Sequence, residues 1–450
     1  MNIKDDFNKK LVSLVLPMAF QAFMLALVSA TDAIMLGLVD QTSLSAVSLG
    51  GQVQFVFELF VLAFATGASI LAAQYWGKGD RETFERIFPI ALRLNLVIGL
   101  VFTAATAFAP AGIMRLLTND GELIASGAEY LRAVSLSYVL CGVSQIYLTA
   151  LKNSDRAGTA SKISAFAVVL NIVANAILIF GLLGAPKLGI TGAAIATVLA
   201  RVVELVWSIL AMSRGTRSGD IVRIRWDLLL KREPELGADF RKYTSPVLAA
   251  SLVWGIAYTL YSVIMGHMGS DAVAANSITG IAKSLVSCFT RGLGNGAGIM
   301  VGNVLGTGDM KLAKEYGRRL THLAIVAGAI TGGLIMLLSP LIVRIAPLSE
   351  TASGYLQIML IFCGVNIMFQ SVNHTVLDGI FTAGGDVIFD MYGNIGAMWC
   401  FAVPLGFIAA FVLHAPATVV YCIVNLDEIV KIWAVYLRYR RFTWLKDLTR

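Results

Sequence analysis

One acidic side chain lies deep inside the first long apolar stretch of the chain. Asp32 is flanked by Ala, Thr and Ile residues, and no Lys or Arg lies within two helical turns of it. A charge at membrane depth is costly, so such a residue is expected to have a partner or a function. A buried carboxylate of this kind can exchange a proton, or it can hold Na⁺ where other oxygen ligands converge on it.

Candidate ligands for such a cation lie in two later apolar stretches. Asn171 and Asn175 are four residues apart, so both amides project from one face of a helix. The next stretch contains a run of small residues around Ala193, and the hydroxyl of Thr197 can donate or accept a hydrogen bond. Because amides and hydroxyls also join membrane helices, spacing alone leaves both a cation site and ordinary interhelical bonding open.

The other ionisable residues of the apolar stretches form two groups. Arg201 with Glu204, and Asp427 and Glu428 with Lys431, are close enough in sequence to neutralise one another. The second group has no oppositely charged neighbour in sequence. Its two cations, Lys283 and Arg291, are eight residues apart and share a helix face, where they could line a cavity or pair with acids across it. With two tyrosines inside predicted spans, this group gives the candidate substrate-cavity residues Glu58, Tyr138, Tyr261, Lys283, Arg291 and Asp378.

The elements that position these residues come from a duplication. A shift of 229 residues aligns the first quarter of the chain with the start of its second half without a gap; it places Pro17 on Pro246, Gly37 on Gly266, Gly51 on Gly280, Gly77 on Gly306 and Asp80 on Asp309. Asp32 falls on Tyr261, so the two copies do not share the candidate chemistry. In a chain this apolar, duplication is typical of transporters that bind their substrate between two repeats.

Composition places these elements in a membrane. Mean hydropathy is +0.76 and only 14% of the 450 residues are charged. Apolar runs long enough to cross a bilayer as helices recur from end to end. We therefore predict an all-α polytopic membrane protein with twelve transmembrane helices, at residues 11–38, 46–75, 87–114, 127–151, 160–184, 189–213, 243–268, 275–305, 318–345, 352–383, 387–413 and 415–437.

Six spans in each half make the two copies cross the membrane in the same direction. They should form two six-helix lobes related by a pseudo-twofold axis along the membrane normal. The predicted parts are an N-terminal lobe (1–213), a cytoplasmic linker (214–242) and a C-terminal lobe (243–450).

Lys and Arg are concentrated at both ends of the chain and in alternate loops, which predicts that both termini are cytoplasmic. We expect the protein in the inner or plasma membrane. This asymmetry accounts for the net charge of +7 without a nucleic-acid partner.

Several functional classes do not fit the sequence. It contains no P-loop, and its four His are scattered along the chain. The five Cys lie inside predicted spans without paired spacing, so we interpret them as reduced packing residues. We expect a secondary transporter rather than an enzyme, without a cofactor, in which an ion gradient drives uphill transport.

The chain resembles the multidrug and toxic compound extrusion (MATE) family over essentially its whole length. The resemblance is carried by Leu16-Pro17 with Asp32-Ala33-Ile34-Met35-Leu36-Gly37, by Gly67-Ala68 through Gln74-Tyr75-Trp76-Gly77-Lys78-Gly79-Asp80, by Gly302-Asn303-Val304-Leu305-Gly306-Thr307-Gly308-Asp309 and by Gly384-Gly385-Asp386. It implies an antiporter, expected to act as a monomer, that expels amphipathic and cationic organic compounds in exchange for H⁺ or Na⁺ by a rocker-switch motion. The alternative from the same superfamily is a flippase for lipid-linked sugars, in which Lys283 and Arg291 would hold a phosphate.

Carried over by position, the resemblance also implies a site. The family's cation site in the N-terminal lobe falls on Asp32, Asn171, Asn175 and Thr197, with the backbone of Ala193 nearby. Na⁺ at this site would be the only metal.

Pro17 falls on a proline associated with bending of the first span, although from the residues alone a static kink is equally open. The sequence departs from the family where some members have an acid at the position of Asn175. Acids that other members have in spans seven and ten are also missing, the second position being Ser371, so a second cation site in the C-terminal lobe is not expected.

Overall fold

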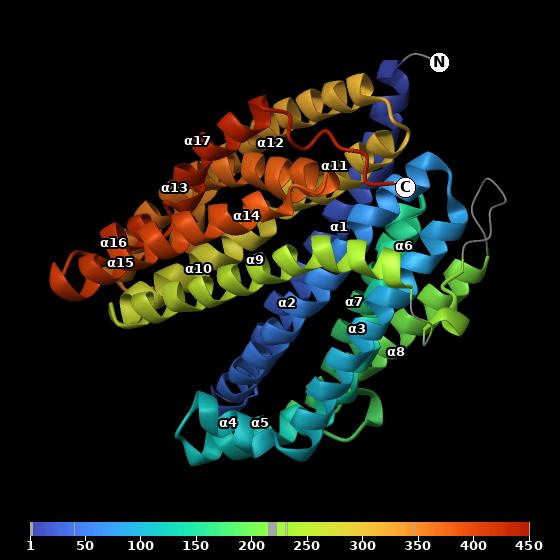
Figure 1. The fold of residues 1–450 in the computed structure, drawn as a ribbon. Helices are drawn as coiled ribbons and strands as arrows, with labels where there is room; N and C mark the ends of the chain where they lie inside the picture. The colour runs from blue at the N-terminus through green and yellow to red at the C-terminus, as the bar shows by residue number, and fades with distance from the viewer. Residues whose placement is uncertain are drawn as a thin grey trace. The chain divides into compact units, whose positions relative to one another are not determined.

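The computed structural model describes residues 3–39, 41–214, 223–229, 231, 233–346 and 348–449. Within these ranges the chain is helical and contains no strand (Figure 1). By length and apolar composition, nine of the described helices can cross a membrane, or up to eleven if each of two bent pairs is counted as one span. The predicted all-α membrane class is confirmed.

Each copy of the repeat supplies a series of long helices. The first copy contains α1 (Ile3–Gly37), α2 (Gln41–Lys78), α3 (Arg81–Phe108), α4 (Pro110–Leu117), α5 (Gly121–Val134), α6 (Leu136–Asn153), α7 (Ala157–Phe180), η1 (Leu182–Gly184) and α8 (Gly189–Ser213). The last of these coincides with its predicted span. A short helical turn in the linker, η2 (Trp226–Leu228), precedes the second copy.

The second copy is more irregular than the first. Its elements are α9 (Pro234–Gly266), α10 (Ser270–Val286), α11 (Cys288–Gly306), α12 (Met310–Ile345), α13 (Glu350–Asn373), η3 (His374–Phe381), α14 (Val387–Asn394), η4 (Ile395–Ala402), α15 (Val403–Phe407), η5 (Ile408–Val412), α16 (Ala417–Val424) and α17 (Asp427–Arg440). The segments η3, η4 and η5 are π-helical, a geometry often found at functional sites.

Four predicted spans differ from the helices observed. The fourth and the eighth are each a pair of helices, bent by 45° and 47° at the break. The third was placed too far along the chain, because α3 ends at Phe108 and Pro110 starts the separate helix α4. The twelfth is two helices, broken at Asn425 and Leu426. The break leaves the Asn425 carbonyl without a helical partner, and Asn366 Nδ2 donates to it at 2.6 Å. Inside a membrane, such a side-chain donor is what makes a broken helix tolerable.

The chain packs into two compact units whose boundaries differ from the repeat boundary. Unit 1 comprises 1–22, 73–79 and 245–450, and unit 2 comprises 23–72 and 80–244. Helices α1 and α2 therefore each contribute one end to unit 1 and the remainder to unit 2. The predicted lobes follow the duplication, whereas these units follow packing, so the lobes remain a prediction.

Within unit 1, one end of α2 crosses one end of α11 through repeat-related residues. A Cβ atom added at Gly77 would lie 1.9 Å from the backbone oxygen of Asn303, and one added at Gly306 would lie 1.9 Å from the backbone oxygen of Gln74. Gln74 and Asn303 are themselves equivalent under the 229-residue shift. The contact is thus reciprocal, as at a twofold axis: each copy presents the same glycine to the same carbonyl of the other. We call it the α2–α11 crossing.

Candidate functional site

The structure brings the predicted polar residues of the first copy into one hydrogen-bonded row. Asn175 Nδ2 lies 2.6 Å from Asp32 Oδ1 and 3.2 Å from Asn171 Oδ1. Asn171 Nδ2 lies 3.4 Å from Thr197 Oγ1, and that hydroxyl donates to the backbone oxygen of Ala193 at 3.0 Å. The row joins α1, α7 and α8, and all of its members belong to unit 2.

Close packing of α7 against α8 sets this geometry. A Cβ added at Gly192 would lie 2.6 Å from the Leu178 oxygen, so the two helices approach more closely there than any side chain would allow. Beside the row, Leu36, Ile179 and Ala193 form a buried apolar cluster. The small residues of α8 therefore bring its Thr hydroxyl within reach of the α7 amides, and the apolar cluster covers one side of the row.

Among the residues that the structure describes, no cation neutralises the charge of Asp32. None of the ion pairs formed by described residues includes it. Asn171 and Asn175 are buried, and Asn175 Oδ1 receives no hydrogen bond although it is shielded from solvent. A buried oxygen without a donor is costly unless something binds it. The row thus places a partly buried carboxylate beside an amide oxygen that accepts no hydrogen bond from the described residues. Oxygen ligands of these two kinds are suited to binding a small cation.

The remaining predicted site residues are dispersed over both units. In unit 2, Glu58 is exposed and accepts from Gln54 at 2.9 Å, while Tyr138 is buried with its ring centroid 5.1 Å from that of Phe57. In unit 1, Tyr261 lies in an apolar cluster and its hydroxyl has no partner. The second copy therefore has an apolar core where the first has its carboxylate.

Neither candidate cation of the second copy forms an ion pair with an acid in the part of the chain that the structure describes. Lys283 Nζ donates to Asn366 Oδ1 at 3.1 Å, and no ion pair of the described chain contains Arg291, which is exposed. Asp378 is bound to His374, one helical turn away on the π-helical segment η3. Sequence reasoning missed this pair because the four His were treated as scattered; the four-residue spacing was the available signal.

The predicted ion pairs are confirmed. Arg201 Nη1 lies 2.7 Å from Glu204 Oε2, and Lys431 Nζ lies 3.4 Å from Asp427 Oδ2 and 3.2 Å from Glu428 Oε1. These groups are structural pairs inside the helix packing rather than free charges. The packing role predicted for the cysteines fails at Cys400, which is exposed.

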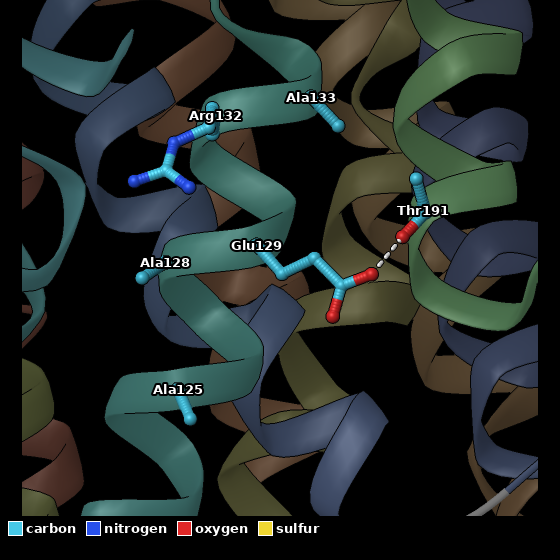
Figure 2. Close-up of a pocket in the computed structure, with 6 residues that line it drawn as sticks. All are labelled: Ala125, Ala128, Glu129, Arg132, Ala133 and Thr191. Atoms are coloured by element: carbon cyan, nitrogen blue, oxygen red, sulfur yellow. Dashed lines mark hydrogen bonds between the residues drawn. The ribbon is translucent and has the colours of Figure 1, made fainter. Parts of the chain in front are cut away.

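A hollow of about 370 Å³ in unit 2 lies apart from the row. It is lined by Ala125, Ala128, Glu129, Arg132, Ala133 and Thr191. Figure 2 shows Glu129 on α5 reaching across to the Thr191 hydroxyl on α8, whereas Arg132 points away from that contact. Its lining contains none of the predicted site residues, so we do not assign the candidate site to it.

Comparison with known proteins adds three findings. The sequence pattern of the family described as MatE matches residues 17–177 and again 246–408, and the two matches start at repeat-equivalent prolines. The "Uncharacterized transporter YisQ" of Bacillus subtilis is 20% identical over 98% of this chain and 96% of its own length. The "Probable multidrug resistance protein NorM" of Rhizobium meliloti is 27% identical over 84% of this chain and 83% of its own length.

The fold is also similar to solved structures. A structure described as the "outward-facing conformation of a multidrug resistance MATE family transporter of the MOP superfamily" matches with a TM-score of 0.87 at 19% identity, over 97% of this chain and 96% of that one. A transporter from Pyrococcus furiosus, described as having a binding pocket of reverse polarity, matches with the same score, identity and coverage. At this identity the likeness establishes the fold, and the twelve-helix, two-repeat architecture is confirmed.

Proposed function

Because this chain belongs to the MatE family of transporters, we propose that it exports amphipathic organic compounds, cationic ones among them, in exchange for a cation bound at Asp32. The observation that carries this proposal is the hydrogen-bonded row from Asp32 to Thr197. In this row, a carboxylate that forms no ion pair with any described residue lies beside a buried amide oxygen that has no hydrogen-bond donor. Relatives that are named as multidrug resistance proteins support an organic, drug-like substrate.

The row suggests how a cation would change the structure around it. Asn175 now donates to the carboxylate and to Asn171 through the same nitrogen, an arrangement that suits a charged Asp32. A proton on Asp32 would weaken this charge-assisted bond. A Na⁺ would instead need oxygens, which Asp32, Asn175 after rotation of its amide, and Thr197 can supply. Either ion thus alters the link between α1 and α7.

We propose that α1 transmits the effect of ion binding at Asp32 to the rest of the protein. The helix passes from unit 1 to unit 2 between residues 22 and 23, with Pro17 on one side of that point and Asp32 on the other. A proline removes one backbone hydrogen bond and makes bending of the helix easier. Each elementary charge that moves across 100 mV contributes about 2.3 kcal/mol, so one coupled ion can sustain a useful gradient of substrate.

The decisive experiment replaces Asp32 by Asn and measures uphill export in proteoliposomes. We expect export against a gradient to stop while expression and thermal stability are retained. The matched control is Asp120→Asn, the same chemical change at the exposed cap of α5, where an amide caps as well as a carboxylate. If Asp32→Asn exports as the wild type does, the carboxylate is not the coupling site.

The coupling ion is a separate question with a separate measurement. Proton and sodium gradients imposed one at a time across the same vesicles, with the membrane potential clamped, distinguish H⁺ from Na⁺. In the proposed arrangement the protein is an ion-coupled secondary transporter in the inner or plasma membrane, a monomer with both termini in the cytoplasm. Protease accessibility of each end in sealed vesicles tests the orientation.

The flippase alternative has less support. It requires Lys283 and Arg291 to hold a phosphate together, but the Lys283 ammonium is already directed to Asn366. The two functions can be separated by measuring the melting temperature of the protein with a cationic dye and with an anionic lipid-linked sugar. Stabilisation by the lipid alone would favour the flippase.

A further inference from the structure

The α2–α11 crossing is closed by packing that tolerates no side-chain growth. Besides Gly77 and Gly306, a Cβ added at Gly302 would lie 2.7 Å from the Cβ of Ala73. The crossing belongs entirely to unit 1 and lies at the end of α2 that charge distribution predicts to be cytoplasmic. Residues 73–79 belong to the first repeat and α11 to the second, so an opening between the two repeats at this end has to part the crossing.

The segment that follows α17, residues 441–449, packs onto unit 1 next to this crossing; it is the red trace after α17 in Figure 1. Trp444 is fully buried, and its backbone oxygen would lie 1.7 Å from a Cβ added at Gly384. The Trp444 ring would lie 2.7 Å from one added at Gly317. The Lys314 ammonium lies 3.9 Å from the centre of the Phe442 ring. The segment is therefore seated in a fitted groove rather than loosely attached.

An ion pair anchors the start of this segment. Asp386, in the turn before α14, accepts from Arg438 Nε and Nη2 at 2.8 Å each and from the Thr443 hydroxyl at 2.7 Å. Burial by itself would raise the pKa of Asp386, but these hydrogen bonds outweigh it and hold the pKa below the ordinary carboxyl range. The carboxylate is thus charged at neutral pH, and the segment stays fixed where it leaves α17.

Beyond Trp444 the segment binds directly to α2. The fully buried Gln74 side chain donates to the backbone oxygen of Lys446 at 3.1 Å and accepts from the backbone N–H of Leu448 at 2.6 Å. It also donates to the Ala383 oxygen at 2.7 Å. Its repeat-equivalent, Asn303, leaves a buried side-chain oxygen without a partner. The two sides of the reciprocal crossing therefore differ. Residues 441–449 form hydrogen bonds with Gln74, and no described residue donates to the equivalent Asn303 side-chain oxygen.

We propose that residues 441–449 are a latch that holds the α2–α11 crossing closed and must release Gln74 before this end of the transporter opens. This inference rests on the proposed alternating exchange, because only a transporter that opens at both ends needs the crossing to part. The latch sets the free-energy difference between the closed and open crossing without touching substrate or cation.

The test uses two variants that remove hydrogen bonds between Gln74 and the latch in different ways. Gln74→Met keeps the length of the side chain and removes its hydrogen bonds. Leu448→Pro deletes the one backbone N–H that donates to Gln74. The controls are Asn303→Leu, a polar-to-apolar change at the equivalent position of the other helix, and Leu448→Ala, which keeps the N–H. All four retain the full chain.

The readout is amide hydrogen exchange in the peptide 302–309, which covers the end of α11 and the turn after it and makes no hydrogen bond to the latch. Rates in Asn303→Leu are corrected for the intrinsic effect of the substitution, because residue 303 lies inside this peptide. It is measured in lipid nanodiscs without substrate or ion gradient. We expect Gln74→Met and Leu448→Pro to raise the exchange rate on the order of tenfold, since each removes one or more buried hydrogen bonds that the open state does not have. Asn303→Leu and Leu448→Ala should stay near wild type.

Unchanged exchange in both Gln74→Met and Leu448→Pro overturns the latch proposal, even if the melting temperature falls. The hydrogen bonds would then stabilise the fold without controlling the opening of the crossing. An equal rise in all four variants also overturns it, because the effect would then be general loosening. Export assays separate this inference from the proposed function: Asp32→Asn decides the coupling site, whereas exchange at α11 is measured with no transport taking place.

Discussion

Two pairs of repeat-equivalent glycines should respond in opposite ways to replacement by alanine. Gly77 and Gly306 form the α2–α11 crossing, where an added Cβ would lie 1.9 Å from a backbone oxygen in each case. Gly51 and Gly280 are also equivalent under the 229-residue shift, and a Cβ added to either would meet nothing within 4 Å. Glycine is present in both copies at both positions, so the sequence alone does not distinguish the two pairs.

The magnitude follows from the distances. Ordinary contact with a Cβ begins at 3.4 Å, so each alanine at the crossing requires a displacement of roughly 1.5 Å. The opposing atom is a backbone oxygen and cannot rotate away, which makes the helices themselves move. Overpacking of this kind costs typically ~1–3 kcal/mol. At Gly51 and Gly280, alanine in a helix interior is neutral or stabilising by up to about 1 kcal/mol.

The assay is thermal unfolding of the purified protein in detergent, followed by intrinsic fluorescence, together with export by proteoliposomes. For a unit of this size, each 1 kcal/mol shifts the melting temperature by ~2–4 °C. We expect Gly77→Ala and Gly306→Ala to melt several degrees below wild type and to export poorly, with Gly51→Ala and Gly280→Ala unchanged or slightly more stable. Wild-type melting in both crossing variants would show that the two helices are not in backbone contact.

Three further predictions use other contacts. Lys431→Met leaves the buried Glu428 without its cation and should destabilise the protein by about 3–5 kcal/mol, seen as loss of the folded monodisperse species in size-exclusion chromatography. Thr197→Val keeps the shape of the side chain but removes its oxygen, so the cation concentration for half-maximal export should rise roughly three- to tenfold; an unchanged value would exclude this hydroxyl as a ligand. The ion pair of Asp386 with Arg438 stabilises the fold fully above the ordinary carboxyl pKa of 3.8 and loses this contribution as pH falls through the lower folded-state pKa. The difference in melting temperature between wild type and Asp386→Asn should therefore be constant from pH 7 to about 5 and shrink below about 4, and a difference that grows on acidification would contradict it.

Local patterns in the sequence determined the class of protein and, together with the family resemblance, the members of the polar row. Apolar runs report directly on membrane spans, because a bilayer imposes a minimum helix length. The four-residue spacing of Asn171 and Asn175 already put both amides on one helix face. The resemblance to the MATE family placed Asp32 and Thr197 with them, and the structure connects all four by hydrogen bonds.

The sequence was less informative where a helix breaks inside an apolar run. The break at Asn425 lies between two apolar segments and is tolerated because Asn366, far away in the chain, donates to its carbonyl. Hydropathy averages over such a position and predicts one continuous span. The bond that permits the break is tertiary, so no window of local sequence contains it.

The duplication could be recognised from the sequence because it preserved residue types at a fixed distance. The role of each preserved residue could not be predicted in this way. Gly77 and Gly51 align equally well with their partners, yet only Gly77 meets a backbone oxygen, and Gln74 differs from Asn303 because a segment more than 360 residues away binds it. Close approach and hydrogen-bond partners depend on which surfaces the fold brings together, and only the tertiary structure decides that.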